Sequence, residues 1–152
     1  MEFTEISNGT DAHVFFSSHC FNLSWDLIDS PNRTIQQDSD MLAAAYTSLW
    51  HWQQRTDCTN QNLSVAFWQL SRVHALLGYA DLARKFAHFA VEYARDEGSF
   101  YLGYGYEALA RAEKLAGNDD MMFRYKTEAA RLSDEITEKD DRDALLADLA
   151  TI

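Results

Sequence analysis

The sequence predicts an all-α protein built from tandem antiparallel helical hairpins. The 152 residues include a single proline, Pro31, and six glycines, which is too few turn residues for a β-rich fold of this length. Apolar residues recur at helical spacing and make up 47% of the chain, which excludes intrinsic disorder. The length suits one domain with a hydrophobic core.

Seven helices are expected from the apolar periodicity and from the breaks between periodic segments. They span residues 10–29, 34–55, 60–78, 80–95, 100–116, 119–135 and 138–150. Residues 1–9 are expected to form a flexible N-terminus, and residues 1–152 a single domain.

The first two helices, within residues 10–55, predict a degenerate hairpin that lacks a turn glycine. Pro31 ends the first helix, because proline excludes the α conformation from the residue before it. The apolar face of the first helix comprises Val14, Phe16, Cys20, Phe21, Leu23, Leu27 and Ile28. The apolar face of the second comprises Leu42, Ala45, Tyr46, Leu49 and Trp52.

The next four helices predict two hairpins, over residues 60–96 and 100–135. Each hairpin breaks at one glycine, Gly78 in the first and Gly117 in the second. A glycine suits the left-handed position that follows a helix C-terminus. The interval of 39 residues between these glycines lies in the range of helical repeat proteins.

The last helix, residues 138–150, is expected to cap the array, with Thr137 as its N-cap and Asp140 three residues later. A terminal repeat needs a polar outer face. That face would consist of Asp140, Asp141, Arg142, Asp143 and Asp148. The apolar residues expected to cover the sixth helix, or otherwise to form a dimer interface, are Leu145, Leu146 and Leu149.

Residues 66–94, AFWQLSRVHALLGYADLARKFAHFAVEYA, resemble a tetratricopeptide repeat (TPR). His74 stands where that repeat usually has a tyrosine. The positions that match are Phe67, Leu70, Ser71, Gly78, Ala83 and Ala90. The small residues among them are those at which the two helices of a TPR hairpin touch.

Residues 104–132, YGYEALARAEKLAGNDDMMFRYKTEAARL, repeat this plan with two departures. Glu113 replaces the aromatic residue, and Met122 replaces the first alanine, so a more open hairpin is expected there. The matching positions are Tyr106, Leu109, Ala110, Gly117 and Ala129. The strings SLWHW, WQLSRVHALLG and YEALARAEKLAG also resemble an uncharacterised bacterial family of small TPR-like proteins, which implies a fold and no catalytic activity.

In TPR proteins the first helix of each hairpin lines a concave groove that binds a protein or peptide. The resemblance places five residues in that groove: Trp68, Arg72, Tyr104, Glu107 and Arg111. Tryptophan, tyrosine and arginine are frequent at binding hot spots, and arginines can receive a partner's carboxylates. Alternatively, Glu107 and Arg111 pair on a solvated surface, and Trp68 packs against the second helix.

The net charge of −11 argues against two classes of partner. Nucleic acids require basic clusters, and an acidic surface is repelled by anionic lipid, so neither nucleic acid nor membrane is expected. The charge either keeps the protein soluble or attracts a basic partner. The first residues contain glutamates and no basic residue, unlike a signal peptide, which favours a cytoplasmic location.

Candidate catalytic and metal-binding residues lack the spacing that such sites require. His13, Cys20 and His51 form no metal-ligand pattern, and neither Cys20 nor Cys58 has basic neighbours in the sequence. We therefore expect a protein-interaction module without enzymatic activity, cofactor or metal. The alternatives are a self-associating structural protein, such as a homodimer, and a metal-binding helical-bundle enzyme.

Overall fold

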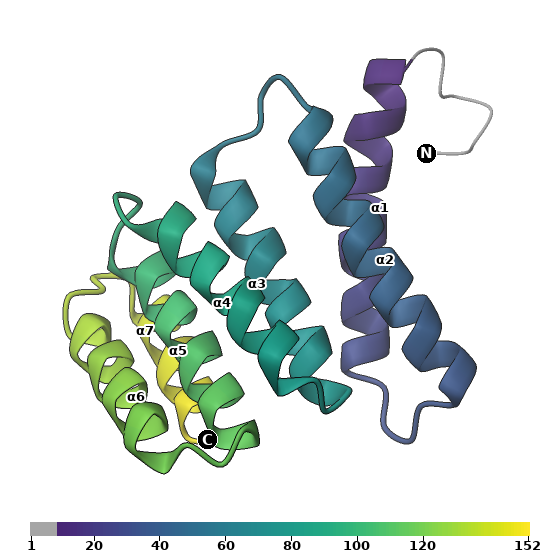
Figure 1. Ribbon diagram of the computed structural model, residues 1–152. Helices are drawn as coiled ribbons and strands as arrows, with labels where there is room; N and C mark the ends of the chain where they lie inside the picture. The colour runs from purple at the N-terminus through teal and green to yellow at the C-terminus, as the bar shows by residue number, and fades with distance from the viewer. Residues whose placement is uncertain (1–8) are drawn as a thin grey trace.

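The computed structural model describes residues 9–152, which form seven α-helices and no strand (Figure 1). The helices are α1 (Gly9–Ile28), α2 (Ile35–Gln54), α3 (Asn60–Leu76), α4 (Ala80–Ala94), α5 (Ser99–Leu115), α6 (Asp119–Ser133) and α7 (Lys139–Leu149). The predicted all-α class is confirmed. Of the expected flexible N-terminus, residues 1–8 lie outside the described residues, whereas Gly9 already belongs to α1.

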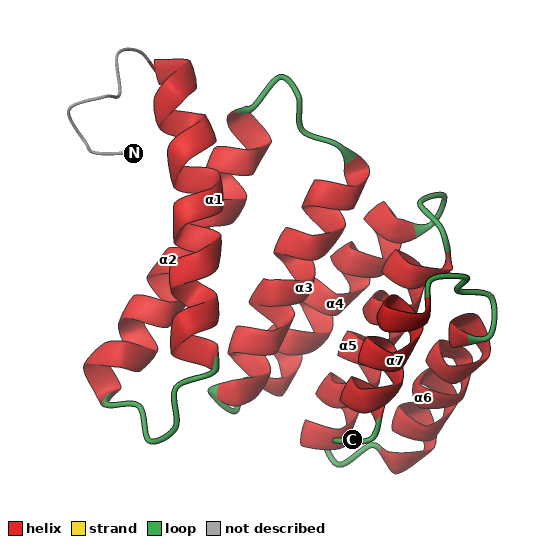
Figure 2. Ribbon diagram, turned by 180° about the vertical axis from the view of Figure 1, so that it is seen from behind, coloured by secondary structure: helices red, strands yellow, loops and turns green. Residues whose placement is uncertain are grey.

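The helices form three consecutive hairpins and a final helix. α1 packs against α2, α3 against α4 and α5 against α6, and each hairpin also contacts the next. α7 contacts both α5 and α6, and Figure 2 shows it lying across α5. The first helices of the hairpins, α1, α3 and α5, therefore share one face of the molecule with α7.

Both predicted glycine turns are confirmed. Gly78 has a φ of +83° and Gly117 a φ of +73°, the left-handed conformation that favours glycine. The N–H of Tyr79 donates to the carbonyl of His74, and the N–H of Asn118 donates to that of Glu113, each at 2.9 Å. These bonds define the same Schellman motif at the end of α3 and of α5.

The α1–α2 hairpin packs through small polar residues, which the predicted apolar face did not include. Val14 and Leu23, expected on that face, are exposed. The buried residues of α1 are Ser17, Cys20, Ser24 and Ile28. The Ser24 hydroxyl donates to the Met41 carbonyl at 3.2 Å, so the short side chain allows close contact without leaving a buried donor unpaired. In the turn, Asn32 takes the left-handed role with a φ of 58°.

α4 and α5 approach closely at Gly105. A Cβ atom on this glycine would lie 2.8 Å from Cγ2 and 3.1 Å from Cα of Val91. Only a residue without a side chain permits this backbone separation. The contact fixes the position of α5 against the preceding hairpin.

The last helix differs from the prediction in its start and in part of its apolar face. Its N-cap is Glu138 rather than Thr137, and no side chain caps it. Leu145 and Leu149 are buried in the C-terminal core, as expected, but Leu146 is exposed. α7 packs into the angle between α5 and α6, so two leucines on one side of the helix are enough to cover that core.

Candidate binding groove

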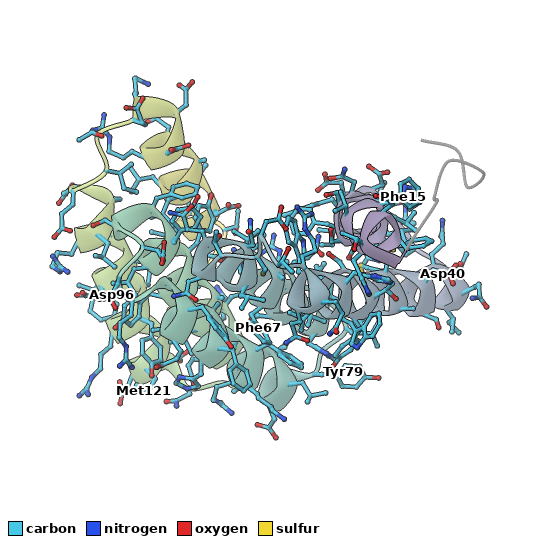
Figure 3. The ribbon with its side chains drawn as sticks, turned by 90° about the horizontal axis from the view of Figure 1, so that it is seen from above. Phe15, Asp40, Phe67, Tyr79, Asp96 and Met121 are labelled. Atoms are coloured by element: carbon cyan, nitrogen blue, oxygen red, sulfur yellow. The ribbon has the colours of Figure 1, made fainter. Side chains whose placement is uncertain are left out.

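An open pocket of about 270 Å³ lies on the face shared by α1, α3, α5 and α7. In Figure 3 the helices α1 (purple) and α7 (yellow) rise on the same side of the molecule, on either side of α3 and α5. Six of the nine lining residues are aromatic. The lining consists of Phe21, Trp25, Ser64, Val65, Trp68, Phe100, Tyr101, Tyr104 and Asp148.

The aromatic rings of the pocket pack against one another across three helices. The ring centroids of Trp25 and Trp68 are 5.3 Å apart, and those of Trp68 and Tyr104 are 5.4 Å apart. Phe100 continues the series at 5.2 Å from Tyr104. Tilted and edge-to-face contacts at these distances are favourable, so the rings hold one another in place.

Trp68 is fixed by a buried carboxylate. Its indole Nε1 donates to Oε2 of Glu107 at 2.8 Å, and Glu107 is only 1% exposed. The other carboxylate oxygen, Oε1, accepts from Nε and Nη2 of Arg111 at 2.8 and 2.5 Å. Glu107 and Arg111 thus pair behind the pocket, largely shielded from solvent, rather than on a solvated surface. The ring contacts of Trp68 are with Trp25 of α1 and Tyr104 of α5.

The position of Tyr104 is fixed by a hydrogen bond to a residue of α7. Its hydroxyl donates to Oδ2 of Asp148 at 2.9 Å. Burial, followed by the Asp148 carboxylate, raises the pKa of the Tyr104 phenol, which keeps it a neutral donor. Asp148 therefore lies on the inner side of α7, and its predicted place on the polar outer face was wrong. Arg111 reinforces this contact through its Nη2, which donates to the Asp148 carbonyl at 3.2 Å and to Thr151 Oγ1 at 2.9 Å.

The α1 side of the pocket is fixed by a buried glutamine of α3. Gln69 is 1% exposed, and its Nε2 donates to the Phe21 carbonyl at 2.9 Å. This bond ties α1 to α3 at the level of the pocket. Buried or half-buried polar partners thus hold the side chains of Trp68 and Tyr104, through Glu107 and Asp148, and the backbone at Phe21, through Gln69.

Arg72 is the least satisfied charged group near the pocket. Its Nη1 lies 3.9 Å from Glu107 Oε1, and its buried Nε has no hydrogen-bond partner in the structure. Burial, and to a lesser degree Arg111, lowers the pKa of its guanidinium, whereas the carboxylates of Glu107, Asp148 and Asp29 raise it. Three carboxylates and one other guanidinium group, that of Arg111, thus act on Arg72.

The structure brings the five predicted groove residues together around Glu107. Of these, only Trp68 and Tyr104 line the pocket; the other three are the charged residues behind it. The contributions of α1 and α7 to the pocket were not predicted, because the expected groove comprised only the first helices of the two repeats. The i,i+4 pair of Phe21 and Trp25 was an available signal, since such a pair shares one helix face.

Other candidate chemistry lies apart from the pocket. Nδ1 of His13 and Nδ1 of His51 are 2.8 Å apart, between α1 and α2. Within residues 9–152, no group of three or more histidine, cysteine, aspartate or glutamate residues could hold a metal ion. Burial raises the pKa of the Cys20 and Cys58 thiols, which disfavours the reactive thiolate.

Fold and site together define an all-α hairpin protein with an aromatic pocket on one helical face. No model of a known protein family matches the chain, and no curated protein or solved structure matches it either. Among the described helices, none combines the length and the apolar character needed to cross a membrane.

Proposed function

We propose that the protein is a TPR-like interaction module that binds an extended segment of a partner protein in the groove of α1, α3, α5 and α7. In this proposal it is cytoplasmic, uses no cofactor and catalyses no reaction. The resemblance of residues 66–94 and 104–132 to TPR hairpins supports it, as does the recurrence of the Schellman turn at Gly78 and Gly117.

The observation that carries the proposal is the fixed aromatic pocket. Binding costs less entropy when the contacting side chains are already ordered. Here the side chains of Trp68 and Tyr104 are held by hydrogen bonds to Glu107 and Asp148, and the backbone of Phe21 is held by Gln69. Aromatic residues in a pre-formed hollow are typical anchors for a partner's side chain.

The chemistry of the pocket favours binding over catalysis. Its titratable groups are Asp148 and the two tyrosines, Tyr101 and Tyr104. Asp148 accepts a hydrogen bond from the Tyr104 hydroxyl, and the pKa of that phenol is raised. This pair therefore provides no activated nucleophile. Neither histidine nor cysteine lines the pocket.

The experiment is a selection from a displayed library of random 12-residue peptides with two matched variants. Tyr101→Ala removes a ring that lines the pocket, whereas Phe123→Ala removes a ring from α6 that is 68% exposed and lies outside it. We expect the wild-type protein to enrich peptides that Tyr101→Ala binds at least about tenfold more weakly, since truncating a hot spot costs about 2 kcal/mol or more. Phe123→Ala should bind them like the wild type.

Two results would count against the proposal. Peptides that bind Tyr101→Ala and the wild type equally would show that the groove is not their site. No enrichment, together with a concentration-dependent dimer in light scattering that Tyr101→Ala abolishes, would instead support self-association through this face.

A further inference from the structure

The pocket combines aromatic faces with one acidic group and no basic one. Six aromatic side chains line it, and Asp148 is its only side chain that is charged at neutral pH. The face of an aromatic ring carries partial negative charge and attracts cations, which an aliphatic wall does not. An apolar occupant would also remove water from the Asp148 carboxylate without replacing its hydrogen bonds, which is costly.

The surrounding charges do not oppose a cation. Arg72 and Arg111 do not line the pocket; Arg111 is paired with Glu107 at 2.5 Å, and Nη1 of Arg72 lies 3.9 Å from the same carboxylate. With Asp148 and Asp29, three carboxylates act on this region against two guanidinium groups. The chain as a whole carries a net charge of −11, which would draw a basic segment towards it.

We propose that the pocket binds an arginine side chain from a basic segment of the partner protein. This inference rests on the proposed function and specifies its ligand. Asp148 uses Oδ2 for Tyr104, so Oδ1 can accept from the guanidinium while the plane of that group stacks on Trp25 or Trp68. Arginine fits better than lysine because its guanidinium is planar and less strongly hydrated than an ammonium group.

The same chain already contains such a stack in another place. The guanidinium carbon of Arg55 lies 4.0 Å from the ring centroid of Trp52. There the cation is also held by a carboxylate, since Nη2 of Arg55 donates to Asp57 at 2.7 Å. The proposed complex would reproduce this combination of ring face and carboxylate with a guanidinium supplied by the partner.

The test uses three capped pentapeptides and the indole N–H signals of the four tryptophans in NMR spectra. The peptides have the sequence Ala-Gly-X-Gly-Ala, where X is arginine, its neutral isostere citrulline, or leucine. We expect the arginine peptide to shift the signals of Trp25 and Trp68 and not that of Trp50, which lies on α2 and lines no part of the pocket. It should bind about fivefold more tightly than the citrulline peptide, in keeping with a cation–π contact.

One conservative variant tests the role of Asp148, and a second variant on the same helix serves as its control. Asp148→Asn can still accept the Tyr104 hydroxyl but carries no charge, so it should weaken the arginine peptide by about fivefold and leave the leucine peptide unchanged. Asp143→Asn, on the exposed side of α7, is the matched control and should bind like the wild type. Circular dichroism verifies that both variants are folded.

The contrary results separate the two proposals. If citrulline or leucine binds as tightly as arginine and shifts Trp25 and Trp68, the cation inference is overturned while the groove function stands. If none of the three peptides shifts these signals at the limit of solubility, the arginine inference is also overturned, and the display selection decides independently whether the groove binds peptides at all.

Discussion

Trp68 and Glu107 are joined by a 2.8 Å hydrogen bond although they are 39 residues apart in the chain. The same interval separates Gly78 from Gly117, so the two residues occupy equivalent positions in consecutive hairpins. Stacking of the hairpins brings equivalent positions of α3 and α5 side by side. Because one position carries a donor and the other a carboxylate, the repeat itself joins the hairpins at the pocket.

Replacing Glu107 by glutamine should destabilise the fold by about 3–5 kcal/mol, the usual cost of removing one charge from a buried ion pair. The amide would leave Arg111 and Arg72 without their buried counter-charge, and removing one partner of a buried pair is costly. Urea denaturation followed by circular dichroism measures the change. The matched control is Glu128→Gln, in the exposed pair with Arg131, which should cost less than about 1 kcal/mol. Equal losses in both variants would contradict the assigned role of Glu107.

The two glycines inside α5 should respond differently to alanine. At Gly105 the added Cβ would meet the Val91 backbone, and this overpacking, at about 1–3 kcal/mol, should exceed the helix-propensity gain of about 1 kcal/mol. At Gly103 the nearest atom, at 2.7 Å, is Cδ2 of the buried Leu145 side chain and no backbone atom, so the leucine can yield without moving a helix, at a cost that offsets the gain in helix propensity. We therefore expect Gly105→Ala to lower the melting temperature and Gly103→Ala to leave it nearly unchanged. The reverse order would show that α4 and α5 are not in close contact.

Stability should fall as the pH drops below about 6.5, the ordinary pKa of an unfolded histidine. Burial lowers the pKa of His74 and of His51 in the folded state, and His13 lowers that of His51 further. Between the folded and unfolded pKa values the unfolded chain binds more protons, so protonation favours unfolding. The free energy of unfolding, measured by urea titration between about pH 7.5 and 5.5, should decrease over that interval.

Two histidine variants test this pH dependence, and His88→Gln is the control. His51→Gln should reduce the loss of stability, whereas His88→Gln, at an exposed position of α4, should not. The lowest pH of the titration stays above the range in which carboxylates ordinarily titrate. The ion pair of Glu113 and Arg84, at 2.5 Å, therefore contributes little to the slope of stability against pH. An unchanged slope in His51→Gln would exclude the histidine pair as a cause.

The sequence predicted the fold well wherever the signal was local. The helices and the turns at Gly78 and Gly117 follow from periodicity and from single residues that break a helix. The face of α1 was predicted less well, because its close contact with α2 uses buried serines that a hydrophobic pattern does not detect. The capping position of α7 was also displaced by one residue, from Thr137 to Glu138, since a weak capping pattern does not fix a helix start.

The residues of the groove were predicted only in part, because spacing within one helix does not identify partners on other helices. Spacing within α3 and within α5 identified residues that share a face, and the structure gathers them around Glu107. The partners that complete the pocket come from distant helices: Trp25 from α1 and Asp148 from α7. Their positions depend on how the hairpins stack and on bonds such as that from Gln69 to Phe21, which no local pattern specifies.

Backbone chemical-shift mapping with a peptide obtained from the display selection tests most directly whether the groove of α1, α3, α5 and α7 binds the partner. If the groove is the binding surface, the largest shifts fall on residues of α1, α3, α5 and α7 that line the pocket, such as Val65, Tyr101 and Asp148. Shifts confined to α2, α4 and α6, with the signals of the pocket unchanged, would contradict the claim that this face binds the partner.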